Sequence, residues 1–164
     1  VHRGAESTFD ISADLTELGR TNVIVVAAGA KAILDIPKTL EVLETQGVPV
    51  VGFGTSEMPA FWSRNSGLAA PLRLDTAEAV AAFQRARNAT HAAGGMLVAN
   101  PIPAADEIPA HEIGVAIEAA LAEAAHNNIS GKAVTPFLLQ RVLERPSPNA
   151  QSEHRWTGRH QATA

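Results

Sequence analysis

Apolar residues gather in three short continuous runs, at 23–26, 48–53 and 96–99. Each run is followed by small or turn-forming residues. Continuous runs of this length, rich in Val and Ile, are typical of strands that are buried on both faces of a parallel sheet. We therefore predict three buried strands, the first over residues 22–28. A fourth, short strand over 71–74 should lie at an edge, because Pro71 has no N–H to donate to a ladder.

Stretches with helical periodicity separate these runs. Gly19 and Gly47 are placed to end two helices, Pro37 opens one at its first position, and Asp75 or Thr76 caps another. The predicted helices span 10–19, 37–46, 57–64, 75–91, 111–126 and 135–143. Strands that alternate with helices indicate an α/β fold. We predict a three-layer α/β/α architecture with a mostly parallel sheet.

Composition narrows the class of protein. The chain has 164 residues, 46% of them hydrophobic, a net charge of −4 and no cysteine. This is one domain's worth of chain with a sizeable core, and a disulfide framework is impossible. Nucleic-acid binding calls for a basic stripe, so the acidic balance argues against it but leaves a small anionic ligand open. No apolar run approaches the length of a membrane span, and we expect a cytoplasmic protein.

Periodicity stops after Glu144. Residues 145–164 are polar and rich in proline and have no helical or strand pattern. We predict that residues 1–144 form the domain and that 145–164 are a disordered tail.

Lys31 is the first candidate for chemistry. It follows the small residues 27–30 at the end of the first strand run, and in open α/β sheets ligands bind just beyond the carboxyl ends of strands. The preceding residues 27–30 offer no acidic partner, and the following residues look helical. An apolar setting and a helix N-terminus both disfavour an ammonium ion, which would favour a nucleophilic amine. The alternative is a surface lysine whose stem covers apolar neighbours.

The second candidate is an acidic cluster made by Asp10, Ser12 and Asp14. The spacing opens like an EF-hand, but the sixth position is not glycine and the twelfth is Thr21, so that site is excluded. Asp10 or Ser12 could cap a helix. One Asp pointing into a cleft could instead bind Mg²⁺ or Mn²⁺, largely through waters. Histidines show no metal-ligand spacing, and of the six only His2 lies near these motifs.

Several long motifs occur in a fixed order: VHRGAESTFDISADL from residue 1, AGAKAILD from 28, LETQGVPVVGFGT from 43, LVANPIP from 97 and GKAVTPFLL from 131. With them the chain resembles the pseudouridine-5'-phosphate glycosidase family, also called the indigoidine synthase A family, over about residues 1–144. Members carry a long upstream segment with a glutamate proton donor and a substrate-binding lysine. The resemblance therefore implies that this chain is the C-terminal part of a longer enzyme and that its fold is partial.

The resemblance implies a reversible C-glycosidase acting between pseudouridine 5'-phosphate and uracil plus ribose 5-phosphate. It assigns the covalent nucleophile to Lys31, a Mn²⁺ ligand to Asp10, and substrate contacts to Ser12, Ala13 and Asp14. It also implies a homotrimer for the full-length form. A C–C glycosidic bond cannot be cut by protonating a leaving oxygen, as in two-carboxylate glycosidases. A lysine can instead open the sugar ring and form an iminium, which accepts electrons.

Two other interpretations remain open. The chain could be an inactive, truncated relative, because the family's acid lies upstream and the matching pattern is lost after Glu144. It could also be an aldolase-like Schiff-base enzyme that uses Lys31 on another phosphosugar.

Overall fold

The computed structural model describes residues 1–144. Its centre is a four-stranded sheet in which every neighbouring pair is parallel, in the order β1-β4-β2-β3. The strands are β1 (Ile24–Ala27), β2 (Val50–Phe53), β3 (Leu72–Leu74) and β4 (Met96–Ala99). The three predicted apolar strands are confirmed, and so is the edge position of the strand that follows Pro71.

Helices separate these strands except between β2 and β3. They are α1 (Ala5–Thr8), α2 (Ala13–Arg20), α3 (Ile36–Thr45), α4 (Ala77–Ala89), α5 (Ala110–His126) and α6 (Val134–Glu144), with single 3₁₀ turns at Ala104–Asp106 and Gly131–Ala133. Side-chain caps stabilise the starts of α3 and α4. The Asp35 carboxylate accepts the Lys38 N–H at the start of α3, and the Thr76 hydroxyl accepts the Ala79 N–H at the start of α4.

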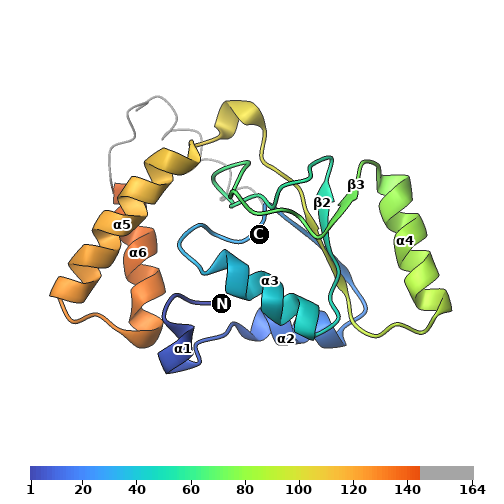
Figure 1. Ribbon diagram of the computed structural model, residues 1–164, viewed down its shortest axis with the longest axis horizontal. Coiled ribbons are helices and arrows are strands. Elements are labelled where there is room, and N and C mark those ends of the chain that lie inside the picture. Colours follow the sequence, from blue (N-terminus) through green and yellow to red (C-terminus); the bar gives the residue numbers. More distant parts are fainter. Residues whose placement is uncertain (145–164) are drawn as a thin grey trace, which may run out of the picture.

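The sheet is the middle of three layers, and α4 lies on the side opposite α2 and α3 (Figure 1). Alternate strand residues point to opposite faces. Val50, Leu97 and Ala99 pack with residues of α2 and α3, whereas Val51, Met96 and Val98 pack with Val80 and Phe83 of α4. The three-layer α/β/α prediction is therefore confirmed.

A second cluster lies away from the sheet, where α5 and α6 pack together (Figure 1). Ile113, Ile117 and Leu138 of these helices enclose Ile33 and Trp62, which come from loops at the ends of β1 and β2. The helix pair is thus attached to the sheet through the loops that follow two strands. Among the described residues, none of the helices has the length and apolar character needed to cross a membrane.

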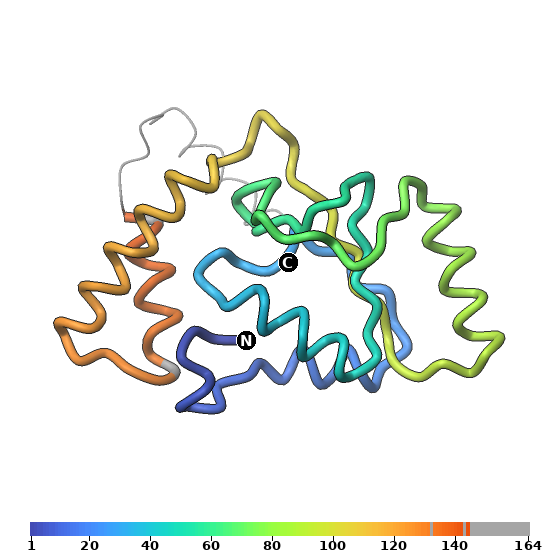
Figure 2. Tube along the Cα trace, in the orientation of Figure 1, coloured from blue at the N-terminus to red at the C-terminus, as the bar shows by residue number. Residues whose placement is uncertain are grey.

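The predicted helix over 57–64 is wrong. Residues 54–71 form an irregular connection between β2 and β3 (Figure 2), tied by isolated bridges between Gly29 and Ala60 and between Glu57 and Ala69. Pro59 interrupts the stretch, and a helix of eight residues is marginal without strong packing on one face. The predicted end of the first helix at Gly19 is also wrong, because α2 continues to Arg20 and is capped by Thr21.

The first strand is not buried, contrary to the prediction. Ile24 is 41% exposed and Val26 is 64% exposed on one face of the strand. Val25, on the other face, is 36% exposed, so neither face is covered. The reason is position: within residues 1–144, β1 pairs on one side alone, with β4. The tail predicted for 145–164 lies outside the described residues.

Candidate functional site

Lys31 lies four residues beyond the end of β1, in the loop that leads to α3. Its backbone carbonyl accepts the Leu34 N–H at 2.8 Å, and α3 begins at Ile36. The predicted helix N-terminus at Lys31 is therefore wrong, because a turn separates this residue from the helix. The Lys31 Nζ lies over the aromatic ring of Phe61, 5.7 Å from the ring centroid.

The connection after β2 lies against the Lys31 loop. Phe61 N–H donates to the Ala28 carbonyl at 3.0 Å, next to the bridge between Gly29 and Ala60. A Cβ on Gly29 would lie 1.9 Å from the Pro59 carbonyl oxygen, and Gly29 has a φ of 90°. Only glycine fits this close approach of two backbones. Gly29, two residues before Lys31, therefore permits the contact that brings Phe61 over the amine.

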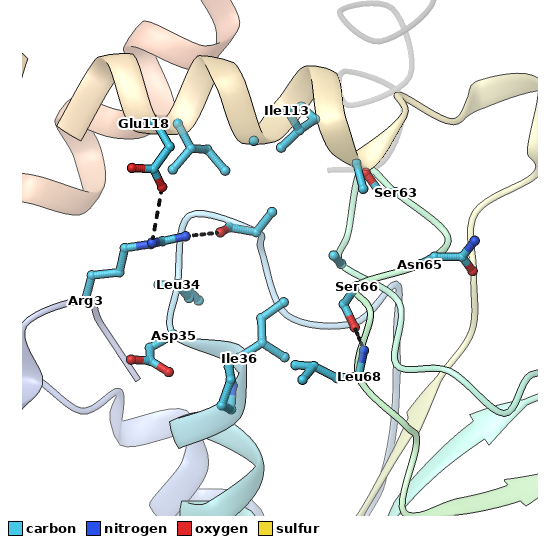
Figure 3. A pocket seen from close by; sticks show the side chains of 16 residues that line it. Arg3, Leu34, Asp35, Ile36, Ser63, Asn65, Ser66, Leu68, Ile113 and Glu118 are labelled. Carbon is cyan, nitrogen blue, oxygen red and sulfur yellow. Dashed lines mark hydrogen bonds and ion pairs between the residues drawn. The ribbon is translucent and has the colours of Figure 1, made fainter. Parts of the chain in front are cut away.

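Arg3 fixes the other end of the same loop. Its guanidinium donates to the carbonyls of Ala32 and Ile33 at 3.1 and 3.0 Å, and it reaches Glu118 of α5 at 3.9 Å. Figure 3 shows Arg3 extended between the loop and α5. Lys31 thus stands between two anchored positions, one made by the 59–61 segment and one made by Arg3.

Asp10 lies just before α2 and is 13% exposed at its side chain. Its Oδ2 is buried, and no hydrogen-bond partner for it exists among the described residues. His2 Nδ1 is 3.9 Å from that oxygen and 2.5 Å from the Thr135 hydroxyl of α6. A buried carboxylate oxygen without a donor is costly unless something else binds it.

The cap of α2 is Ser12, whose hydroxyl accepts the Asp14 N–H at 3.3 Å. Ala13 and Asp14 are exposed in the first turn of the helix. Of the two caps considered in the sequence, Ser12 is the right one, and the Asp10 carboxylate is left for another role.

Residues 1–3 connect the acidic cluster around Asp10 with the loop that carries Lys31. His2 N–H donates to the Asp10 carbonyl at 3.1 Å, and Asp35 N–H donates to the Val1 carbonyl at 3.0 Å. The same short segment therefore contacts the acidic cluster through His2 and the Lys31 loop through Arg3. Sequence reasoning missed Arg3 and Phe61, although Arg3 belongs to the first motif and Pro59 was a signal against the helix that hid Phe61.

A cavity of about 440 Å³ lies beside this loop (Figure 3). Arg3, Asp35, Ser66 and residues of α5 line it, whereas Lys31, Asp10, Ser12 and Asp14 do not. The cavity therefore adjoins the loop at Ala32 and Ala60, but the Lys31 side chain does not line it. We place the candidate site on the lysine and the acidic cluster rather than in this cavity, because strand ends and unpaired polar atoms point to chemistry.

The acidic cluster offers a divalent cation a single buried ligand. Among residues 1–144, no group of three or more His, Cys, Asp or Glu side chains could hold a metal ion. The orphaned Asp10 Oδ2 nevertheless fits a hard cation that keeps most of its waters. The residues present therefore fit one-ligand binding of Mg²⁺ or Mn²⁺ and do not fit a closed metal cage.

Residues 1–153 match the family described as Indigoidine synthase A like protein. The chain belongs to this family. It is 68% identical over 144 residues to the pseudouridine-5'-phosphate glycosidase of Dinoroseobacter shibae, and 66% identical to that of Methylobacterium nodulans. Both matches cover 88% of this chain but only 47% and 43% of the relatives. The chain thus spans about half the length of these curated relatives.

Two solved structures have a similar fold over about half of their own length. The prealnumycin C-glycosynthase AlnA, in complex with ribulose 5-phosphate, matches with a TM-score of 0.82 and 35% identity over 94% of this chain and 48% of that one. An indigoidine synthase A-like protein of Thermotoga maritima matches with a TM-score of 0.74 and 38% identity, over 88% and 46%. The family resemblance expected from the motifs is therefore confirmed.

Proposed function

We propose that this chain supplies the nucleophile-bearing half of an enzyme that cleaves and forms the C-glycosidic bond of pseudouridine 5'-phosphate. The observation that carries the proposal is the position of Lys31, beyond the carboxyl end of a parallel strand and in contact with an aromatic ring. The curated relatives supply the substrate, since both are named for pseudouridine-5'-phosphate glycosidase activity.

In this mechanism Lys31 Nζ attacks C1' of the ribosyl group, and the ring C–O bond breaks as its oxygen takes a proton. The nitrogen lone pair then forms an iminium while the C1'–C5 bond to uracil breaks. Uracil C5 keeps that electron pair and accepts a proton. Water hydrolyses the iminium, which releases ribose 5-phosphate and regenerates the amine. The reverse order of steps forms the bond.

The acidic cluster binds the substrate and a cation in this proposal. Asp10 would hold Mn²⁺ or a similar divalent ion through the oxygen that has no donor among the described residues. When bound, the ion would offset the repulsion between the substrate phosphate and the nearby carboxylates. Ser12, Ala13 and Asp14 stand at the first turn of α2, where backbone N–H groups suit an anion.

Bond formation is the second candidate for the physiological direction. The observation that favours it is the similarity to AlnA, which is named a C-glycosynthase and was solved with a ketose phosphate. The same lysine chemistry serves both directions, because the iminium of ribose 5-phosphate can accept a carbon nucleophile.

The adduct can be tested directly on the 164-residue chain. Ribose 5-phosphate and borohydride should label Lys31 irreversibly, and peptide mass spectrometry locates the label among the three lysines. Lys31→Ala should abolish it, whereas Lys38→Ala should leave it intact, since Lys38 forms ion pairs with Asp35 and Glu6. Label that persists in Lys31→Ala contradicts the assignment.

Turnover is expected to need more than these 164 residues. Because the relatives are about twice as long, we expect no measurable uracil release with Mn²⁺ and pseudouridine 5'-phosphate from this chain alone. Addition of the remaining half of the Dinoroseobacter shibae relative should restore release, and light scattering is expected to show three copies of each half, corresponding to a homotrimer of the full-length form. Rapid release by the chain alone would point to an acid within it, with Glu6 and Glu17 as the first residues to replace.

A further inference from the structure

The Lys31 amine and the Phe61 ring form a contact that the covalent chemistry does not require. Lysine side chains are long and flexible, and a nucleophile that samples many rotamers attacks slowly. The ring centroid lies 5.7 Å from Nζ, which is within the range of a cation–π interaction. The half-buried ring therefore restricts where the amine can go.

Phe61 adopts a backbone conformation that is rare for its residue type. Its φ is 68°, in the left-handed region that a bulky side chain seldom occupies. Such conformations persist only where surrounding contacts hold them, and they are concentrated at functional sites. Here the Phe61 N–H donates to Ala28, and the ring packs edge-on against buried Trp62, with centroids 5.3 Å apart. The conformation directs the ring toward Lys31.

We propose that Phe61 is a positioning residue for Lys31: its ring holds the amine in the direction of attack at the end of β1. The proposal rests on the covalent role proposed for Lys31. The backbone on both sides of the amine is also fixed, by the Gly29–Ala60 bridge and by the bonds from Arg3 to Ala32 and Ile33. The Phe61 ring adds the restraint on the side chain that those backbone contacts cannot give.

The contact can be measured without any reaction. In the full 164-residue chain labelled with ¹³C at lysine Cε, the Lys31 resonance should be shifted upfield by the Phe61 ring current, away from that of Lys38. The shift should disappear in Phe61→Leu and return in Phe61→Tyr, which keeps the ring. The matched control is Phe137→Leu, because Phe137 also packs in the α5–α6 cluster and has a cation, Arg141, 5.2 Å from its ring.

The consequence for chemistry is measured by the initial rate of borohydride-trapped labelling of Lys31 with ribose 5-phosphate. Because the ring confines the amine to a few of its rotamers, its loss in Phe61→Leu should slow labelling by about two- to fivefold. Phe61→Tyr and Phe137→Leu should stay near the wild-type rate. An unshifted Lys31 resonance in the wild-type chain overturns the proposal, and so does a lost shift with an unchanged rate. Failure to label Lys31 in the wild-type chain, with the shift present, contradicts the proposed covalent function instead.

Discussion

Strands β1 and β4 lie side by side in the same sheet and have similar apolar sequences, but their surroundings differ. Ile24 pairs in register with Met96, and Val26 with Val98. Met96 is fully buried and Val98 is 3% exposed, whereas Ile24 and Val26 are 41% and 64% exposed. An apolar run therefore encodes a strand, but its burial depends on how many neighbours the fold supplies.

The contrast extends beyond the strands. β4 has strands on both sides and helices over both faces, and its side chains fill two cores. The part of the chain that leads to β1 also has exposed Phe9 and Ile11 and the buried Asp10 oxygen without a donor. Most of the large exposed apolar side chains among the described residues thus lie between Phe9 and Val26, and contiguous exposed apolar groups usually mark a binding surface.

Replacing the paired residues Val26 and Val98 with a charged residue should reveal the largest difference in stability between the two strands. We expect Val98→Asp to destabilise the chain by about 3–5 kcal/mol, because a carboxylate there would be buried without a partner. The matched Val26→Asp should change the free energy of unfolding by less than about 0.5 kcal/mol. Urea denaturation followed by circular dichroism measures both. Equal losses would mean that β1 is covered in solution.

Adding the other half of the proposed enzyme should remove the difference in solvent exposure between β1 and β4. With the remaining half of the Dinoroseobacter shibae relative present, we expect the β1 amides to be protected from hydrogen exchange as strongly as those of β4. Covering an apolar side chain completely contributes about 1.5–3 kcal/mol, so even two or three half-exposed ones give a measurable effect. Val26→Lys should weaken the complex, whereas Val115→Lys, at an exposed position on α5, is the control. If hydrogen exchange at β1 stayed unchanged in an active complex, β1 would not be the surface that the other half covers.

Replacing Asp10 should have a smaller effect, and this effect should appear in the affinity for a metal ion rather than in the stability of the fold. We expect Asp10→Ala to lower the affinity for Mn²⁺ by about tenfold or more, since it removes the buried carboxylate that we propose as a ligand. Stability without metal should hardly change, because Ser12 caps α2. Calorimetric titration and thermal unfolding separate the two effects. Asp75→Ala, an exposed Asp paired with Arg73, is the control, and a full Mn²⁺ affinity in Asp10→Ala would remove Asp10 from the proposed site.

The smallest effect concerns the loops that follow the two strands. Burial raises the pKa of Asp35, but hydrogen bonds from the side chain and backbone of Lys38 outweigh it and leave the pKa lowered. The pKa of Glu6 is lowered by its own backbone N–H and by Lys38. Carboxyl groups with depressed pKa values stabilise the fold at neutral pH, and this contribution is lost as the pH falls below about 4.

Lys38→Met should therefore lower the melting temperature slightly at pH 7 and have less effect at pH 3. The loop after β4 contains Pro101 and Pro103, and its stiffness does not depend on titration. Hydrogen exchange at low pH should accordingly increase near residues 31–38 before it increases near 100–103. A constant effect of Lys38→Met across this pH range would show that the ion pairs contribute nothing measurable.

Much of the fold could be predicted from local pattern. The strand runs, Pro37 at the start of α3, Thr76 at the start of α4, and the edge position of β3 all follow from interactions within a few residues. In the stretch 57–64, Pro59 is a local signal against a helix, but the conformation that forms instead is fixed by partners such as Gly29, some thirty residues away. The same holds for the choice of Ser12 over Asp10 as the cap of α2, where both side chains have the right chemistry.

By itself, the sequence determined that a lysine follows a parallel strand in an α/β fold and that an acidic, hydroxyl-bearing cluster precedes a helix. These features depend on residue type and order along the chain. Only the tertiary structure decided that β1 is an exposed edge, that Phe61 faces the Lys31 amine, and that the Asp10 oxygen is buried without a donor. The physical reason is that burial and contact are properties of pairs of segments. A strand pattern is encoded by one segment, whereas the neighbour that covers it, or leaves it open, is encoded elsewhere.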